Sequence, residues 1–172
     1  MFELKPMSRD NVDAALAKAE RYRLLNEAWE ADSICRDVLA VDPGNTQAIR
    51  LLILATTDRF TAFDDTDVDE ARELLQELPS EYERCFYGGV ICERKGKKLF
   101  THAPIEAGPA VYRWLREAMT WYERAEEHRT NEGDDAILRW NTCARMIDRH
   151  KHVRPPPGPP SGEWRIRDLA SQ

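Results

Sequence analysis

Apolar residues recur at intervals of three and four positions along most of this chain, and that spacing constrains the fold more than any other feature. It dominates from Asn11 to His150, whereas the alternation of apolar and polar residues typical of a strand is scarce there. A period near 3.6 places apolar side chains on one face of a helix. We therefore expect an all-α protein.

Breaks in this pattern divide it into about seven helices. The first carries Ala19 and Tyr22, and the second stops where Pro43 cannot continue the backbone hydrogen bonds and Gly44 can reverse the chain. The third helix, at about 46–60, is apolar nearly all the way round. A helix of that kind must be covered on more than one side, so we expect it in the middle of the assembly.

The next two helices are separated from their neighbours by longer loops. Asp67 and Glu70 have the spacing of a capping box, which predicts that Asp67 begins a short fourth helix ending before Pro79. A fifth helix is expected at about 81–96. The excess length between helices falls in two predicted loops, at about 61–67 and 97–108.

Two more helices complete the series. Pro109 suits the first position of a long sixth helix, because its missing N–H would be unpaired there in any case. The seventh spans about 134–150. Its predicted buried face consists of Ile137, Trp140, Ala144 and Ile147, with Arg139 on the opposite, solvated side.

The chain length suits one compact unit with tails. We divide it into an N-terminal extension (1–10), a helical domain (11–150) and a proline-rich tail (151–172). Five prolines in the six positions 155–160 exclude a helix and favour an extended segment. We expect this tail to be disordered, although it could also offer a polyproline ligand to an aromatic-lined domain.

The net charge of −6 disfavours nucleic acid as a partner, because a protein that neutralises phosphates needs a basic surface. We find no secretory signal and no run of about 18 apolar residues, so we expect a cytoplasmic protein that does not enter a membrane. The four cysteines lack a CxxC pair and lie within helical patterns. We interpret them as reduced, buried packing residues.

Residue spacing supplies little sign of chemistry. The acidic residues 64–69 resemble a calcium loop, but Glu70 and Gln76 occupy the positions that need glycine and a bidentate glutamate. Nothing in the spacing pairs a cysteine with a histidine base, and we place His102 in the predicted loop at 97–108. We find no zinc-binding or phosphate-binding motif. We therefore expect no cofactor, no metal and no enzymatic activity.

Small residues recur where neighbouring helices would cross. Ala31, Ala71 and Ala118 occupy equivalent places in the second, fourth and sixth helices, each followed four residues later by a larger side chain. Ala19 and Gly89 are their counterparts in the first and fifth helices. The alanine-to-alanine steps are 40 and 47 residues, and insertions of this kind in a loop cost little free energy.

This arrangement resembles the tetratricopeptide repeat, a helix-turn-helix unit of about 34 residues with small residues at the helix crossing and a proline after the second helix. The best match is 12–45, and two weaker units follow. The second has Ile53 in place of the small residue in its first helix. The resemblance implies a right-handed superhelix of antiparallel helix pairs, closed by the seventh helix as a cap.

The resemblance also implies that the first helix of each unit lines a concave groove that binds a peptide or helix of another protein. Its predicted lining is Leu16, Arg23, Arg50, Leu54, Phe86, Val90, Arg94, Leu138, Thr142 and Arg145. Apolar anchors among arginines would suit an acidic segment. Alternatively, the apolar members complete the core and the arginines are merely solvated.

Some members of this family clamp the terminal carboxylate of a chaperone with lysines and asparagines. Leu16 and Glu20 stand in the corresponding wall of the first unit, so that subtype is excluded. The sequence thus predicts a protein-binding scaffold or adaptor. The alternative is a self-associating structural module, favoured by the apolar third helix and by the aromatic residues Trp114, Trp121 and Tyr122 of the sixth. A cysteine-dependent enzyme is a third and weaker alternative.

Overall fold

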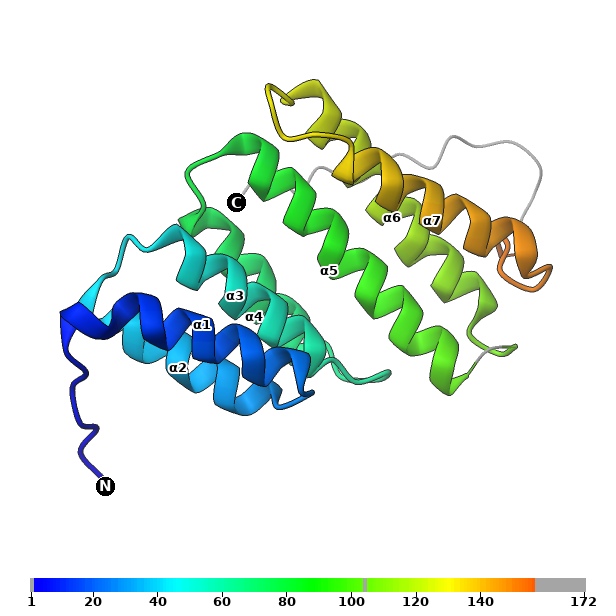
Figure 1. Ribbon diagram of the computed structural model, residues 1–172. Coiled ribbons are helices and arrows are strands. Elements are labelled where there is room, and N and C mark those ends of the chain that lie inside the picture. Colours follow the sequence, from blue (N-terminus) through cyan, green and yellow to red (C-terminus); the bar gives the residue numbers. More distant parts are fainter. Residues whose placement is uncertain (1, 104, 157–172) are drawn as a thin grey trace.

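The structure, a computed structural model, describes residues 2–103 and 105–156 and is all-α, as the sequence predicts (Figure 1). Short 3-10 turns at Arg9–Asn11 and Leu75–Glu77 accompany the helices. Within these residues there are seven α-helices: α1 (Val12–Leu24), α2 (Ala28–Val41), α3 (Thr46–Asp58), α4 (Thr66–Leu74), α5 (Glu81–His102), α6 (Gly108–Glu127) and α7 (Asp135–Arg149).

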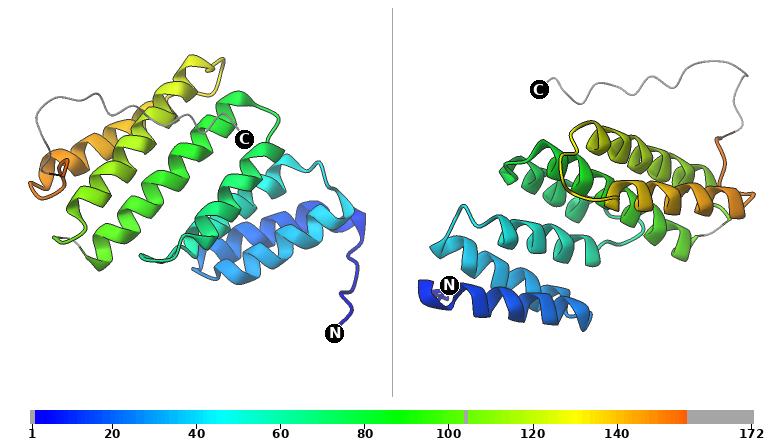
Figure 2. Two further views of the ribbon diagram at one scale, coloured as in Figure 1. Left: turned by 180° about the vertical axis from the view of Figure 1, so that it is seen from behind. Right: turned by 45° about the horizontal axis from the view of Figure 1, so that its top comes forward.

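The helices form two layers. Figure 1 shows α1, α3, α5 and α7 side by side in front, with α2, α4 and α6 behind them, and Figure 2 shows the same arrangement from two other directions. Each helix therefore packs against the next one in the chain and, within its layer, lies beside the next but one. This alternation places the odd-numbered helices on a common face.

Alanines lie at the crossings between the layers. Ala31, Ala71 and Ala118 are 1%, 0% and 0% exposed, which confirms their predicted place between helices. The prediction for α3 is also confirmed: eight of its residues are buried, and it contacts α1, α2, α4 and α5. Asn45 caps this helix by accepting a hydrogen bond from the backbone N–H of Ala48 at 2.9 Å.

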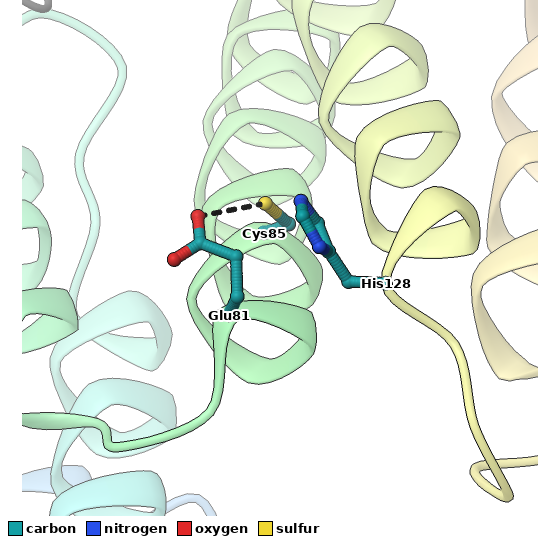
Figure 3. A group of neighbouring side chains, drawn as sticks. All are labelled: Glu81, Cys85 and His128. Carbon is teal, nitrogen blue, oxygen red and sulfur yellow. Dashed lines mark hydrogen bonds between the residues drawn. The ribbon is translucent and has the colours of Figure 1, made fainter.

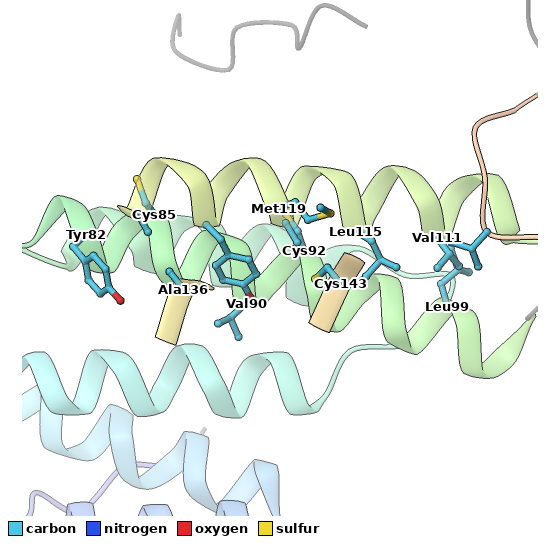
Figure 4. Close-up of a cluster of buried hydrophobic side chains, with 14 of the residues drawn as sticks. Tyr82, Cys85, Val90, Cys92, Leu99, Val111, Leu115, Met119, Ala136 and Cys143 are labelled. Carbon is cyan, nitrogen blue, oxygen red and sulfur yellow. The ribbon is translucent and has the colours of Figure 1, made fainter. Parts of the chain in front are cut away.

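The core is continuous from one end of the stack to the other. An α1–α3 cluster around Leu16 and Leu52 meets an α3–α5 cluster around Ile53 and Ile91, because Leu39 and Leu74 pack against both. Trp114 joins the second cluster to a third, formed by α5, α6 and α7 (Figure 4). The apolar faces of successive helices thus merge into one elongated core.

Two predicted boundaries are wrong. Asp67 does not cap α4, since Asp65 stands at that position and the Asp67 carboxylate instead accepts a hydrogen bond from Arg59 at 3.0 Å. Helix α5 does not stop at Gly96 but continues to His102, so residues 97–102 of the predicted loop at 97–108 are helical. Gly96 is tolerated because the side chains of α6 lie against its backbone, where a larger residue would be crowded.

The predicted buried face of α7 is confirmed in part, since Trp140, Ala144 and Ile147 pack against the core. Ala136 and Cys143 are fully buried, whereas Ile137 is 37% exposed and Arg139 turns inward toward α5. The helix packs mainly against α6, and Ala136 and Cys143 are added to the stripe that residue spacing favours. Beyond α7, Val153 is 2% exposed and packs on the core, so the folded part extends past residue 150. Tail residues 157–172 lie outside the described residues.

Candidate protein-binding face

The ten residues predicted to line a groove come from the four helices of one layer. Figure 1 shows these helices, α1, α3, α5 and α7, on a common face, which we call the odd-helix face. The residues contributed are Leu16 and Arg23 from α1, Arg50 and Leu54 from α3, Phe86, Val90 and Arg94 from α5, and Leu138, Thr142 and Arg145 from α7.

Two of the ten are not at the surface. Leu16 is 2% exposed and Val90 is 0% exposed, and each belongs to a core cluster. Their placement in a groove is therefore corrected: they face a neighbouring helix of the stack, where a partner could not reach them. Leu54 and Phe86 are half-buried and pack against the α5–α7 part of the core.

The arginines of this face tie neighbouring helices together. Arg23 of α1 donates to the carboxylate of Asp58 at the end of α3, at 2.8 Å, and Arg94 of α5 pairs with the same carboxylate. Arg94 also donates to the hydroxyl of Thr57, at 2.8 Å. A single carboxylate thus receives two guanidinium groups from the helices on either side.

A second bridge crosses the same face nearer its other end. The guanidinium of Arg50 on α3 pairs with the carboxylate of Glu83 on α5, at 2.5 Å. Phe86, one turn further along α5, lies beneath the guanidinium of Arg139, which is 5.7 Å from the ring centroid. These contacts make the predicted binding residues part of the scaffold as well.

Glu93 of α5 is the most deeply buried carboxylate of this face, at 2% exposed. It accepts hydrogen bonds from the hydroxyl of Tyr122 at 2.6 Å and from Arg139 at 3.0 Å, and it pairs with Lys97. Burial alone would raise the pKa of Glu93, but the bonds from Lys97 and Tyr122 hold it below its ordinary value. The carboxylate is therefore ionised in the interior and joins α5, α6 and α7.

A hollow of about 270 Å³ opens between the end of α3 and the exposed end of α5. Its lining is Thr57, Asp58, Arg94, Lys97, Lys98 and Thr101. Lys97, Lys98 and Thr101 of this lining belong to the last two turns of α5, which follow Gly96. Among the predicted groove residues only Arg94 lines it.

Positive charge exceeds negative charge around this hollow. Its lining includes the cations Arg94, Lys97 and Lys98 and one carboxylate, Asp58, with which Arg23 also pairs. Burial lowers the pKa of Arg94, and the neighbouring guanidinium groups of Arg23 and Arg139 lower it further against the opposing effect of Asp58. This basic site stands out in a chain whose net charge is −6.

The three α7 residues remain accessible. Leu138 is 60% exposed, and Thr142 and Arg145 are exposed too, with the Thr142 hydroxyl donating to the carbonyl oxygen of Leu138 at 2.9 Å. They extend the odd-helix face beyond Arg139 and supply an apolar side chain beside a cation.

Sequence reasoning missed several residues of this face. These residues stand at a helix end or in a predicted loop: Asp58, Lys97, Lys98 and Thr101. The apolar spacing of α5 does not indicate that the helix continues beyond Gly96. Glu93 carries no signal of its own, since an isolated glutamate in a helix is normally solvated. Its partners come from α6 and α7 and become visible only when those helices are in place.

The cysteines are free and buried, as the sequence predicts. Burial raises the pKa of the Cys35 and Cys143 thiols to about 12, so these sulfurs are protonated near neutral pH and are poor nucleophiles. The structure also brings a cysteine near a histidine that residue spacing did not pair with it, with Sγ of Cys85 and a ring nitrogen of His128 within 4.8 Å.

Comparisons with models of known protein families, with curated proteins and with solved structures gave no match. Within the described part of the chain, every helix is too short or too polar to cross a bilayer. The odd-helix face and its basic hollow are therefore the features from which a function can be argued.

Proposed function

We propose that this chain is a non-catalytic binding module that receives an acidic segment of another protein on its odd-helix face. The observation that carries the proposal is the excess of cations around the hollow between α3 and α5. Positive charge gathered at one place on an acidic protein attracts a negatively charged partner and orients its approach.

The rest of the face suits the same kind of partner. Leu54 and Phe86 offer half-buried apolar surface between the charged bridges, and Leu138 offers an exposed apolar side chain on α7. A helical or extended segment with apolar anchors spaced among carboxylates would match this alternation. The proposed partner therefore combines acidic residues, which reach Lys97 and Lys98, with apolar residues that lie across α5 and α7.

The proposal retains the resemblance to tetratricopeptide repeats, including the right-handed superhelix and the role of α7 as a cap. It is supported by the buried alanines at the crossings and by the two-layer order of the helices. We also propose a cytoplasmic location, to which four free thiols are suited. The acidic net charge argues against nucleic acid as the partner.

The proposal can be tested with peptides displayed as a random library. The chain is immobilised, bound peptides are sequenced, and the affinities of the enriched peptides are measured by fluorescence anisotropy. We expect enrichment of peptides that combine acidic and apolar residues. Replacing Lys98→Glu and Arg145→Glu together should weaken their binding at least about tenfold, because a lost charge pair at a partly desolvated site is worth more than ~1 kcal/mol.

The matched control changes the same charge elsewhere. Arg113 and Arg116 are exposed on α6, in the other layer. An Arg113→Glu, Arg116→Glu variant should bind the selected peptides nearly as well as the original chain at moderate salt, where charges further apart than about 8–10 Å are screened. Enrichment of basic or purely apolar peptides, or an equal loss in both variants, would contradict the proposal.

A second candidate function is self-association through the turn between α1 and α2. Leu24, Leu25 and Trp29 are 72%, 60% and 70% exposed within six residues of one another. Clustered apolar side chains of this kind are favoured at protein interfaces. The occupant in this case is a second copy of the chain, which would pair turn to turn.

Light scattering at micromolar concentrations separates the two functions. A stable dimer that becomes monomeric in a Leu24→Ser, Leu25→Ser variant would favour self-association. Phe63→Ser provides the control, because Phe63 is 82% exposed but lies in a different loop. A monomer at all concentrations would eliminate this candidate and leave the binding module.

A further inference from the structure

Three side chains from two helices converge at the end of the molecule where α5 begins and α6 ends. Figure 3 shows Glu81 and Cys85 on the first turns of α5 and His128 directly after α6, with the sulfur between the carboxylate and the imidazole. One donor atom from each lies within 4.8 Å of the other two. The Cys85 thiol donates a weak hydrogen bond to Oε1 of Glu81 at 3.8 Å.

We propose that Glu81, Cys85 and His128 form a binding site for a zinc-like transition-metal ion. The three side chains supply one oxygen, one sulfur and one nitrogen, which is a set of donors that Zn²⁺ accepts and that Ca²⁺ and Mg²⁺ do not prefer. Glu81 and Cys85 are spaced i and i+4 on α5, which places these two ligands on the same side of the helix, as in helical zinc motifs.

The geometry is close to that of a bound ion. In a tetrahedral site with zinc bond lengths of about 2.0–2.3 Å, neighbouring donor atoms are roughly 3.5 Å apart. The present separations exceed this by about 1.3 Å at most, since all fall within 4.8 Å. His128 is exposed and can rotate to close the site, whereas Cys85 is 2% exposed and is fixed by packing.

The surroundings of Glu81 already orient its carboxylate. Arg84 donates to Oε2 through Nε at 3.1 Å, which leaves Oε1 directed toward the Cys85 sulfur. The Arg84 side chain is itself held in place, because it also donates to the carbonyl oxygen of Leu78 in the segment before α5. Partners in this position keep a ligand in its binding orientation.

The charges of the three ligands suit a dication. A doubly charged ion neutralises one carboxylate and one thiolate, and the thiol proton is released to solvent. Three protein ligands leave a fourth position for water, so the site would hold the start of α5 to the end of α6 while remaining accessible from outside.

Cobalt(II) titration of the full chain, first freed of metal with a chelator, tests this site. Cobalt bound to a thiolate gives a charge-transfer absorption in the near ultraviolet, and tetrahedral coordination gives intense visible bands. We expect both in the original chain, and we expect Zn²⁺ to displace the cobalt and abolish them. Absence of the thiolate band would overturn the proposal.

Matched variants locate the site. Cys85→Ala should abolish the thiolate band, whereas Cys35→Ala, which removes another buried thiol, should retain it. His128→Ala should weaken cobalt binding by more than about tenfold. His102→Ala is its control, because His102 is likewise an exposed histidine at a helix end.

Substitutions of the two exposed ligands keep the test valid if the Cys85→Ala variant misfolds. If Cys85→Ala alters the circular dichroism spectrum, Glu81→Gln and His128→Ala still decide the question, since neither side chain is buried. A thiolate band that persists unchanged in Cys85→Ala, or equal binding by the His128→Ala and His102→Ala variants, would overturn the assignment. None of these results depends on whether the odd-helix face binds a partner.

Discussion

The half of the molecule made by α1–α4 and the half made by α5–α7 pack their helices by different means. In the first half, the alanines at the predicted crossings, Ala19, Ala31 and Ala71, are buried, and Ala19 and Ala71 belong to clusters made largely of aliphatic side chains. In the second, the backbone of α5 at Gly88 and Gly89 lies against the rings of Trp121 and Tyr122 on α6. Aliphatic side chains around an alanine can shift to accommodate an added group. An aromatic ring packed directly against a glycine backbone has almost no room to move.

Each half also buries a carboxylate, but in a different setting. Asp32 on α2 pairs with Arg36 and Arg59, and both arginines have a second acidic partner in Glu70. Glu93 on α5 receives Tyr122, Arg139 and Lys97. The first carboxylate belongs to a network with several acids, whereas the second is the single acceptor on which three donors converge. The second half should therefore be less tolerant of substitution.

The largest effect is expected at Gly89. A Cβ at this position would lie 2.8 Å from Cζ of Tyr122 and closer still to two other ring carbons. We expect Gly89→Ala to lower the free energy of unfolding by about 3 kcal/mol, because this overpacking outweighs the ~1 kcal/mol that alanine gains in a helix. Urea unfolding followed by circular dichroism measures the change.

Two matched changes test whether the cost is local to the ring contact. At Gly44 an added Cβ meets nothing within 4 Å, so Gly44→Ala should alter stability by less than about 0.5 kcal/mol. Ala71→Gly, at a crossing of the first half, should cost only about 1–2 kcal/mol. If Gly89→Ala left the free energy of unfolding unchanged, the proposed difference in packing between the two halves would be wrong.

The next largest effect is expected at the buried carboxylates. Glu93→Gln keeps the shape but loses the charge that balances Arg139 and Lys97, and we expect a loss of about 2 kcal/mol in the free energy of unfolding. Asp32→Asn should cost about 1 kcal/mol, since its arginines retain Glu70. Equal losses in the two variants would show that the number of acidic partners does not matter.

The pH dependence of stability separates the same two residues. The pKa values of Glu93 and Asp32 both lie below their ordinary values of 4.5 and 3.8 despite burial. The unfolded chain therefore binds protons first as pH falls, and stability is present above the ordinary pKa and is lost as pH drops through the folded-state value. Urea unfolding between about pH 7 and pH 3 should show this decline.

Each variant should lack the part of the acid-induced loss of stability that its carboxylate causes. Glu93→Gln and Asp32→Asn should both give a shallower fall in stability with acid than the original chain, because each lacks one group that must be protonated. A curve for Glu93→Gln that ran parallel to that of the original chain would show that this carboxylate is not held ionised in the folded state.

The smallest effects are expected at the helix caps. Asn45 accepts from the backbone N–H of Ala48 at 2.9 Å in the first half, and Ser80 accepts from that of Glu83 at 3.4 Å in the second. Asn45→Ala should cost about 1 kcal/mol, and Ser80→Ala about 0.5 kcal/mol because its hydrogen bond is long. Thermal unfolding of the two variants compares them, and a larger loss for Ser80→Ala would reverse the order.

Prediction from the sequence worked where a local rule was sufficient. Pro109 stands in the first turn of α6, and Pro43 follows α2, because backbone restrictions act within a few residues. It failed where a partner lay far along the chain. Asp67 has a capping spacing, yet its carboxylate turns to Arg59, and Gly96 looks like a helix end until Trp114 and Leu115 are placed beside it.

The candidate binding face shows the same division. The sequence placed all ten residues on helices that share one layer, since seven were chosen from the first helix of a pair and three from the closing seventh helix. It could not say that Leu16 and Val90 are enclosed, that the arginines bridge adjacent helices, or that a hollow forms beyond the end of α3. Each of these depends on the distance between helices and on their lengths.

The sequence by itself determined the helical class, the number of helices and the alanine crossings, because periodicity and side-chain size act along a single helix or between neighbours in the chain. Only the tertiary structure decided which charges share a carboxylate and which donors meet at Glu81, Cys85 and His128. The physical reason is that side-chain period fixes the face on which a residue lies but not its depth or its partners. Those follow from how closely helices approach and where each one ends.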